Sequence, residues 1–185
     1  VQQLAALFYS GSALGAVFAG DLITLFFYWE GTAIASVFLI WARGTVGAFN
    51  TGLRYLIIQI MSGVILLSGA ALLWRETGSI TFDKMTLESL GTWLIFISFG
   101  MKCAFPLMHN WLQDSYPAAT VTGTVILSAF TTKLAVYALA RGFAGTEILI
   151  YIGAIMTIFP IFLAEIENDL RRVLAYSLNN QLGFM

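Results

Sequence analysis

Charge is what this sequence has least of. Of its 185 residues, 10% are charged and 59% are hydrophobic, and the formal net charge at pH 7 is −1. A soluble globular domain carries about 25% charged residues, so this chain has too little charge to cover a surface that faces water. The mean hydropathy of +0.85 agrees, and we expect a membrane protein. Nothing in this charge balance provides the basic surface that nucleic acid binding needs, so we expect no nucleic acid partner.

Cysteine and histidine are also scarce, with one of each in the chain. Cys103 cannot form an internal disulfide, and in its apolar surroundings a thiol mostly fills space. One cysteine and one histidine do not make a cluster of metal ligands, and no glycine-rich nucleotide motif is present. We therefore expect no metal and no cofactor, and a conventional enzyme is the class that we favour least.

Long apolar segments fill most of the chain. A helix that crosses the hydrocarbon core needs about 20 mostly apolar residues, and six segments qualify, followed by a seventh that breaks off. They are Gln3–Ala19, Leu22–Trp41, Leu53–Trp74, Leu90–Trp111, Ala118–Arg141, Glu147–Leu163 and Leu170–Met185. The alternation that a membrane barrel requires is absent, so the fold class is all-α. We expect one transmembrane domain over residues 1–185, as a piece of a longer polytopic protein.

The Lys and Arg residues of the short loops predict the orientation of these spans. Seven spans place Arg43, Arg54, Arg171 and Arg172 on one side and Arg75, Lys84 and Arg141 on the other. The small excess predicts that the loop between residues 43 and 54 and the turn at residues 169–172 face the cytoplasm.

Four ionisable side chains fall inside the predicted spans: Glu30, Lys102, Lys133 and, nearer an end, His109. Each costs a few kcal/mol at the centre of a bilayer, and such residues are retained mostly where they pair or face a cavity. Glu30 and Lys102 reach similar depth, because their spans run in the same direction. One carboxylate and two amines near one plane predict a proton relay.

Structural roles remain as alternatives. A static ion pair between Glu30 and Lys102 would only fix helix packing, although the second amine, Lys133, favours a relay. His109 suits proton handoff because imidazole titrates near neutrality, yet it could equally cap or pack a helix near the membrane interface.

Two spans carry further irregularities. Pro106 removes a backbone donor and should kink or break its helix, and broken helices at membrane depth usually line a cavity. Pro160 predicts an ordinary kink. Near Lys133 lies a group of hydroxyls that could extend a polar pathway or serve helix packing: Thr124, Ser128, Thr131 and Thr132.

These motifs together resemble a known family. The pattern comprises WE in the second span, K-x3-P-x2-H-x-W-L-x-D in the fourth, a mid-helix lysine followed by VYALARG, and NDLRRVLAYSLNNQLGFM at the end. It is similar to the antiporter-type subunits shared by respiratory complex I, membrane-bound hydrogenases and multisubunit Mrp-type Na⁺/H⁺ antiporters, and it looks most like the D-type component of the last. One departure is Thr120, where relatives carry the second proline of a proline-rich turn.

The resemblance implies a fold of about fourteen helices with inverted repeats and a broken helix at Pro106. The first repeat would cover residues 3–141, and the second would begin at residues 147–185. Glu30 corresponds to the glutamate of the family's fifth helix and Lys102 to the lysine of the broken seventh helix, with which that glutamate pairs. Lys133 corresponds to the eighth-helix position that passes protons toward the centre. His109 corresponds to the histidine of the PxHxWL motif.

The implied function is membrane proton translocation by a subunit of a monovalent cation/proton antiporter in the cell's inner (plasma) membrane. Its partners would be other subunits, the lipid bilayer and protons, with Na⁺ as a candidate ion. A proton-pumping subunit of a respiratory NADH dehydrogenase or hydrogenase is the alternative, and there it would be a translocase component. A structural membrane scaffold is the alternative from another class.

Overall fold

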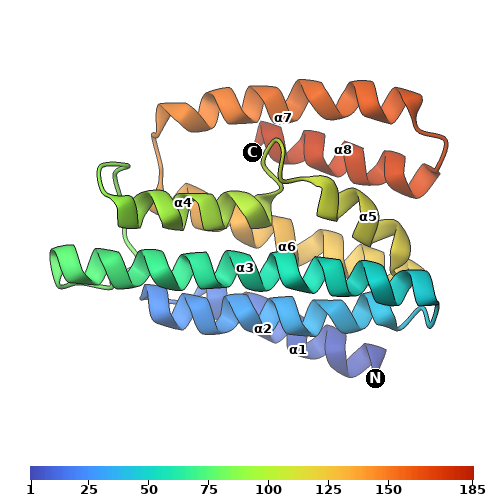
Figure 1. Ribbon diagram of the computed structural model, residues 1–185, viewed down its shortest axis with the longest axis horizontal. Coiled ribbons are helices and arrows are strands. Elements are labelled where there is room, and N and C mark those ends of the chain that lie inside the picture. Colours follow the sequence, from blue (N-terminus) through green and yellow to red (C-terminus); the bar gives the residue numbers. More distant parts are fainter.

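The computed structural model describes residues 1–185 as a bundle of eight helices, without a β-strand (Figure 1). The helices are α1 (Gln2–Val17), α2 (Leu22–Trp41), α3 (Val46–Thr77), α4 (Leu90–Cys103), α5 (Asn110–Ala118), α6 (Val121–Gly142), α7 (Glu147–Ile166) and α8 (Leu170–Phe184). In Figure 1, α3 crosses the front, α1 and α2 lie below it, α6 lies behind, and α7 and α8 form the upper edge. The all-α prediction is confirmed.

The helix bounds differ from the expected ones mainly in two places. Helix α3 is longer than the expected Leu53–Trp74, because Thr45 caps its start by accepting the Ala48 N–H and Gly78 ends it in the left-handed conformation. The expected span Leu90–Trp111 is not one helix, since it divides into α4 and α5. Seven expected segments therefore form eight helices.

The break in the fourth span begins two residues before Pro106. Helix α4 ends in a Schellman turn, in which the Phe105 N–H reaches the Gly100 carbonyl and the Ala104 N–H reaches the Met101 carbonyl. Ala104 has φ 62°, a left-handed conformation that alanine rarely adopts. Pro106 disfavours helical geometry in Phe105, and the Schellman turn ends the helix two residues earlier, at Cys103, just after Lys102.

Four helices are long and apolar enough to cross a membrane: α2, α3, α6 and α7. Helix α4 is apolar but has only 14 residues, which is shorter than a bilayer crossing. Helix α1 has 16 residues, so the expected first span is also short of that length. The short connection from α4 to α5 lets these two pieces continue one after the other through the bundle (Figure 1).

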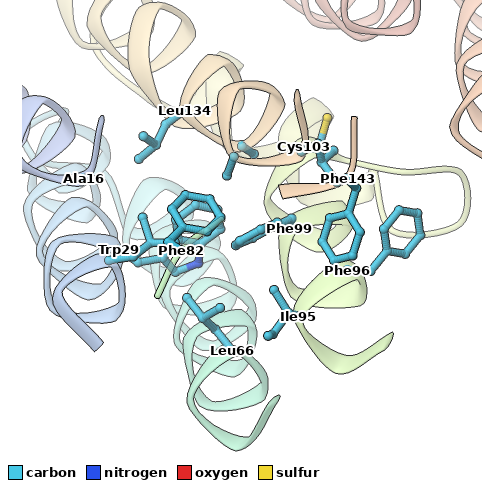
Figure 2. Packing of buried hydrophobic residues seen from close by; sticks show 14 of the residues in the cluster. Ala16, Trp29, Leu66, Phe82, Ile95, Phe96, Phe99, Cys103, Leu134 and Phe143 are labelled. Carbon is cyan, nitrogen blue, oxygen red and sulfur yellow. The ribbon is translucent and has the colours of Figure 1, made fainter. Parts of the chain in front are cut away.

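Two buried apolar clusters hold the bundle together. The larger is rich in aromatic rings, with Trp29 against Phe99 at a centroid distance of 5.2 Å and Phe96 against Phe143 at 5.2 Å (Figure 2). The smaller lies under α5, where the rings of Tyr55 and Trp111 are 5.5 Å apart. Ring pairs at these distances contribute beyond the area that they bury. Lys102, at the end of α4, is fully buried in the same interior.

The end of α2, the start of α3 and the start of α8, which carry or adjoin the arginines that the sequence places on one side, lie at one end of the bundle, on the right in Figure 1. Arg43 and Arg171 both donate to the carbonyl of Pro117 at the end of α5. Arg54 forms an ion pair with Asp114 at 3.4 Å. At the opposite end, Arg141 donates to the Ala19 carbonyl at 2.7 Å. That the first end faces the cytoplasm stays a prediction.

Candidate functional site

Lys102 is the most deeply buried charged residue, with 0% of its surface exposed. Its Nζ donates to the Trp29 carbonyl at 2.7 Å and to Thr32 Oγ1 at 2.8 Å. It also lies 4.1 Å from the centroid of the Trp29 ring, a distance at which a cation is attracted to an indole face. These neutral acceptors partly offset the cost of burying an ammonium group.

Glu30 lies on the same turn of α2 but points toward α3. A Cβ atom added to Gly63 of α3 would overlap the Glu30 carboxylate, so the carboxylate occupies the space that this glycine leaves free. Glu30 is half-buried, and its Oε1 has no hydrogen-bond partner within the chain. An unpaired buried carboxylate oxygen is costly and indicates a place for water or a mobile proton.

The direct ion pair between Glu30 and Lys102 that the sequence suggested is not formed. The ion pairs within 4.0 Å join Arg54 to Asp114 and Arg172 to Glu167. The reason is helix geometry, since successive residues of α2 are about 100° apart around the axis. The Trp29 carbonyl and the Thr32 hydroxyl face Lys102 at the end of α4, whereas the Glu30 carboxylate lies against Gly63 of α3. The structure brings the acid and the amine to one turn of α2 without contact.

Lys133 is half-buried on α6, and its Nζ donates to the Ser128 carbonyl at 2.8 Å. Its side chain lines a cavity of about 180 Å³ between α6 and α1, together with Ala13, Leu14 and Val17. Leu134, next to Lys133, and Cys103, next to Lys102, belong to the same buried cluster. The two lysines therefore come from neighbouring parts of the bundle and do not touch.

His109 precedes α5 in the break, where 8% of its surface is exposed. Its ring packs edge-on against Phe159 of α7 at a centroid distance of 5.5 Å. It makes no side-chain cap on α5, and its Nδ1 has no hydrogen-bond partner within the chain. The structure does not bring His109 into contact with Glu30 or either lysine.

The four predicted hydroxyls divide into two groups. Thr124 and Ser128 donate to backbone carbonyls of residues 116, 120 and 125, and both line a cavity of about 340 Å³ between α6 and α8. Thr131 is hydrogen-bonded to the Tyr9 hydroxyl, and Thr132 is fully buried with no partner for its Oγ1. The first group is accessible from the bundle surface and the second lies in the interior.

Sequence reasoning missed several buried polar residues beside this site: Tyr9, Thr32, Ser36, Tyr55 and Gln59. Gln59 offered a signal, because its amide interrupts the apolar run LIIQIM. Tyrosine, serine and threonine offered none, since they occur throughout membrane helices as packing residues.

An all-helical bundle with long apolar helices, a broken helix and a buried lysine defines a polytopic membrane protein. A family model described as NADH:quinone oxidoreductase/Mrp antiporter, TM, matches residues 19–185. The chain belongs to this family.

Individual relatives agree with the family match. The chain is 28% identical to the D-type component of the Na(+)/H(+) antiporter of Alkalihalophilus pseudofirmus, over 92% of this chain and 38% of that protein. It is 29% identical to the M-type component of the NADH-quinone oxidoreductase of Pseudomonas aeruginosa, over 95% of this chain and 40% of that protein. A protein in the structure of the Mrp complex from Dietzia sp. DQ12-45-1b superposes with a TM-score of 0.88 at 24% identity, over 96% of this chain and 37% of that one, and so shares the fold. The chain thus spans about two fifths of the length of these proteins.

Proposed function

We propose that this chain is the part of an antiporter-like subunit that takes up and relays protons, within a multisubunit monovalent cation/proton antiporter of the plasma membrane. The observation that carries the proposal is the position of Lys102. Its fully buried amine is held by neutral oxygens of the α2 turn that also carries Glu30. Intramembrane amines and carboxylates of this kind mostly serve ion pathways.

The proposed mechanism uses two arrangements of one lysine. In the arrangement seen here, Nζ of Lys102 donates hydrogen bonds to the Trp29 carbonyl and to Thr32 Oγ1, and Lys102 forms no ion pair with the Glu30 carboxylate. In the second, Lys102 pairs with Glu30, which stabilises the ammonium form. When Lys102 returns to the first arrangement, its ammonium group loses the stabilisation by Glu30. Release of the Lys102 proton toward Lys133 is then favoured. A two-state element can couple distant events because each state can be favoured separately.

The test is substitution in the full-length protein within its assembled complex. Lys102→Ala and Glu30→Gln should each abolish proton-linked transport in vesicles while the complex still assembles. Lys84→Ala is the matched control, because this lysine is exposed in the loop between α3 and α4. Normal transport by Lys102→Ala would reject the relay.

A second candidate is a proton-pumping subunit of a respiratory NADH dehydrogenase or hydrogenase. The observation that favours it is the comparable identity to a component of an NADH-quinone oxidoreductase. Purified complex distinguishes the two, since an antiporter exchanges cations without an electron donor and a respiratory complex transports protons only during electron transfer.

A structural scaffold is the remaining alternative. It predicts that Lys102 and Lys133 have no contact with water and that apolar residues can replace them without loss of function.

The division into repeats also belongs to the proposal. Residues 3–141 would form the first repeat, and residues 147–185 would begin the second. The packing of α7 against α8 at one edge of the bundle supports this division (Figure 1).

A further inference from the structure

The loop between α3 and α4 carries one side chain that reaches far into the bundle. Asp83 and Lys84 of this loop are exposed, yet Phe82 beside them is 0% exposed. The centroid of the Phe82 ring lies 6.0 Å from that of Phe99 (Figure 2). Phe99 belongs to α4 and precedes Lys102 by three residues. A loop side chain therefore contacts the same helical turn that ends with the buried amine.

Backbone hydrogen bonds hold this loop across the end of the bundle. The Phe82 N–H donates to the Gly20 carbonyl at 3.0 Å, and the Leu22 N–H donates back to the loop at 2.9 Å. Both partners belong to the connection between α1 and α2. On the other side of Phe82, the Met85 N–H donates to the Gly142 carbonyl at the end of α6, at 2.6 Å. The loop is thus fixed on both sides of the buried ring.

The last turn of α6 supplies a site for this ring. Cζ of Arg141 lies 4.6 Å from the centroid of the Phe82 ring, a distance at which a cation is attracted to an aromatic face. The same guanidinium donates to the Ala19 carbonyl at 2.7 Å, which anchors it to the connection between α1 and α2. The next residue, Gly142, leaves room for the ring, because an added Cβ would come within 3.2 Å of Phe82.

Aromatic rings continue from Phe82 to the buried amine. The centroids of Phe99 and Trp29 are 5.2 Å apart, and Nζ of Lys102 lies 4.1 Å from the centroid of the Trp29 ring. Phe82 and Phe99 have no polar atom, so neither can accept a proton and pass it on. Apolar constrictions in membrane proteins exclude water. On this side of Lys102 the side chains therefore form a barrier.

We propose that Phe82 is a seal that closes Lys102 off from water at the end of the bundle where the α3–α4 loop lies (Figure 1). Arg141 is a positioning residue, because it holds the ring in place and has no part in the relay. The seal rests on the proposed function, since a relay produces coupled transport only if its amine cannot exchange protons with both sides at once. Without the seal, the same amine becomes a route for proton leakage.

The test measures passive proton leak through the full-length protein in its assembled complex. Vesicles in choline buffer, with no Na⁺ and no electron donor, are given a pH gradient. Phe82→Ala should raise the leak per complex about tenfold, because it removes a ring contact and a cation contact from the barrier. Adding Lys102→Ala should return the leak to the wild-type rate. A merely structural role would lower assembly, and the leak would not depend on Lys102.

Matched variants separate the seal from a general loosening of the bundle. Phe27→Ala makes the same change on α2, where 68% of the side chain's residue is exposed, and should leave the leak unchanged. Phe82→Leu keeps an apolar side chain and should leak less than Phe82→Ala.

Arg141 tests the same seal from the side of α6. Arg141→Gln removes the cation over the ring and should raise the leak about threefold. Arg141→Lys keeps the charge and should retain most of the seal. These two variants decide the question if Phe82→Ala fails to assemble.

The outcomes also distinguish the seal from the proposed function. Loss of coupled transport in Lys102→Ala, together with a wild-type leak in Phe82→Ala and Arg141→Gln, would overturn the seal alone. Normal transport in Lys102→Ala would overturn both. A leak in Phe82→Ala that persists after Lys102→Ala is added would show an opening that bypasses the amine, and the seal would again be rejected.

Discussion

Gly63 gives the Glu30 carboxylate its place against α3. An added Cβ would overlap the carboxylate, so a larger residue must push Glu30 out of its position. In the proposed mechanism, Lys102 moves between its neutral acceptors on α2 and the Glu30 carboxylate. A carboxylate displaced from that turn would no longer be within reach of the lysine. At this position the absence of a side chain is therefore as important to the site as the charge beside it.

This argument predicts the effect of Gly63→Ala. We expect loss of proton transport close to that of Glu30→Gln, in a complex that still assembles, measured as transport per complex in vesicles. The control is Gly47→Ala, also in α3, where an added Cβ meets nothing within 4 Å. Alanine in a helix is favoured over glycine by about 0.5–1 kcal/mol, so the control should assemble at least as well. Full transport by Gly63→Ala would show that Glu30 need not occupy this position.

At the scale of single helices, caps decide where each element begins. The side chain of Asp21 accepts hydrogen bonds from the Thr24 N–H and hydroxyl, both at 2.7 Å, and so starts α2 just outside its apolar run. These bonds hold the pKa of the Asp21 carboxyl below its usual value of 3.8. The cap fixes the helix that carries both Glu30 and the acceptors of Lys102.

The sign of the pH effect follows from the lowered pKa. A carboxyl whose pKa is lower in the folded state contributes stability above its unfolded pKa and loses it as pH falls through the folded value. Asp21→Ala should cost about 0.5–2 kcal/mol at neutral pH, measured as a fall in the thermal midpoint of the detergent-solubilised complex. This difference from the wild type should shrink below about pH 4.

Asp21→Asn provides the control for charge, because an asparagine caps nearly as well and does not titrate. It should keep most of the thermal midpoint at neutral pH. A midpoint in Asp21→Ala equal to that of the wild type at pH 7 would show that the cap contributes nothing measurable.

Elements also differ in how far the sequence predicts them. The bounds of α2 were predicted to the residue, because Asp21 and the loop after Trp41 enclose a continuous apolar run. The division of Leu90–Trp111 was expected at Pro106, yet the helix ends at Cys103. The proline predicts that a break occurs, but the left-handed turn at Ala104 depends on hydrogen bonds back to residues 100 and 101.

At the scale of the whole molecule, the arginine-rich end is built by contacts between segments far apart in sequence. The turn that follows α5 receives Arg43 from the loop after α2 and Arg171 from the start of α8. Since these loops meet, they must lie on the same side of any membrane that the bundle crosses. The loop between α3 and α4 lies at the other end (Figure 1).

Cysteine labelling tests this arrangement. Asn168→Cys, in the turn before α8, and Ser79→Cys, in the loop after α3, are both exposed. We expect a membrane-impermeant maleimide to label residue 168 from the cytoplasmic side and residue 79 from the opposite side. The native Cys103 is buried with 3% exposure, so the wild type serves as the unlabelled control. Labelling of both positions from one side would contradict the bundle's orientation.

The sequence by itself determined that the chain is embedded in a membrane, because it has too few charged residues to cover a surface that faces water. It also determined that the chain is helical, because its long apolar segments lack the alternation of a membrane barrel. It also determined which ionisable residues are present in the apolar spans, since their cost in lipid makes Glu30, Lys102 and Lys133 conspicuous. Only the tertiary structure decided what they contact. Side-chain direction around α2 and the space above Gly63 separate Glu30 from Lys102, and the packing of α3 buries Gln59 with neither end of its amide paired. These features depend on how helices pack against one another, which spacing along a chain does not specify.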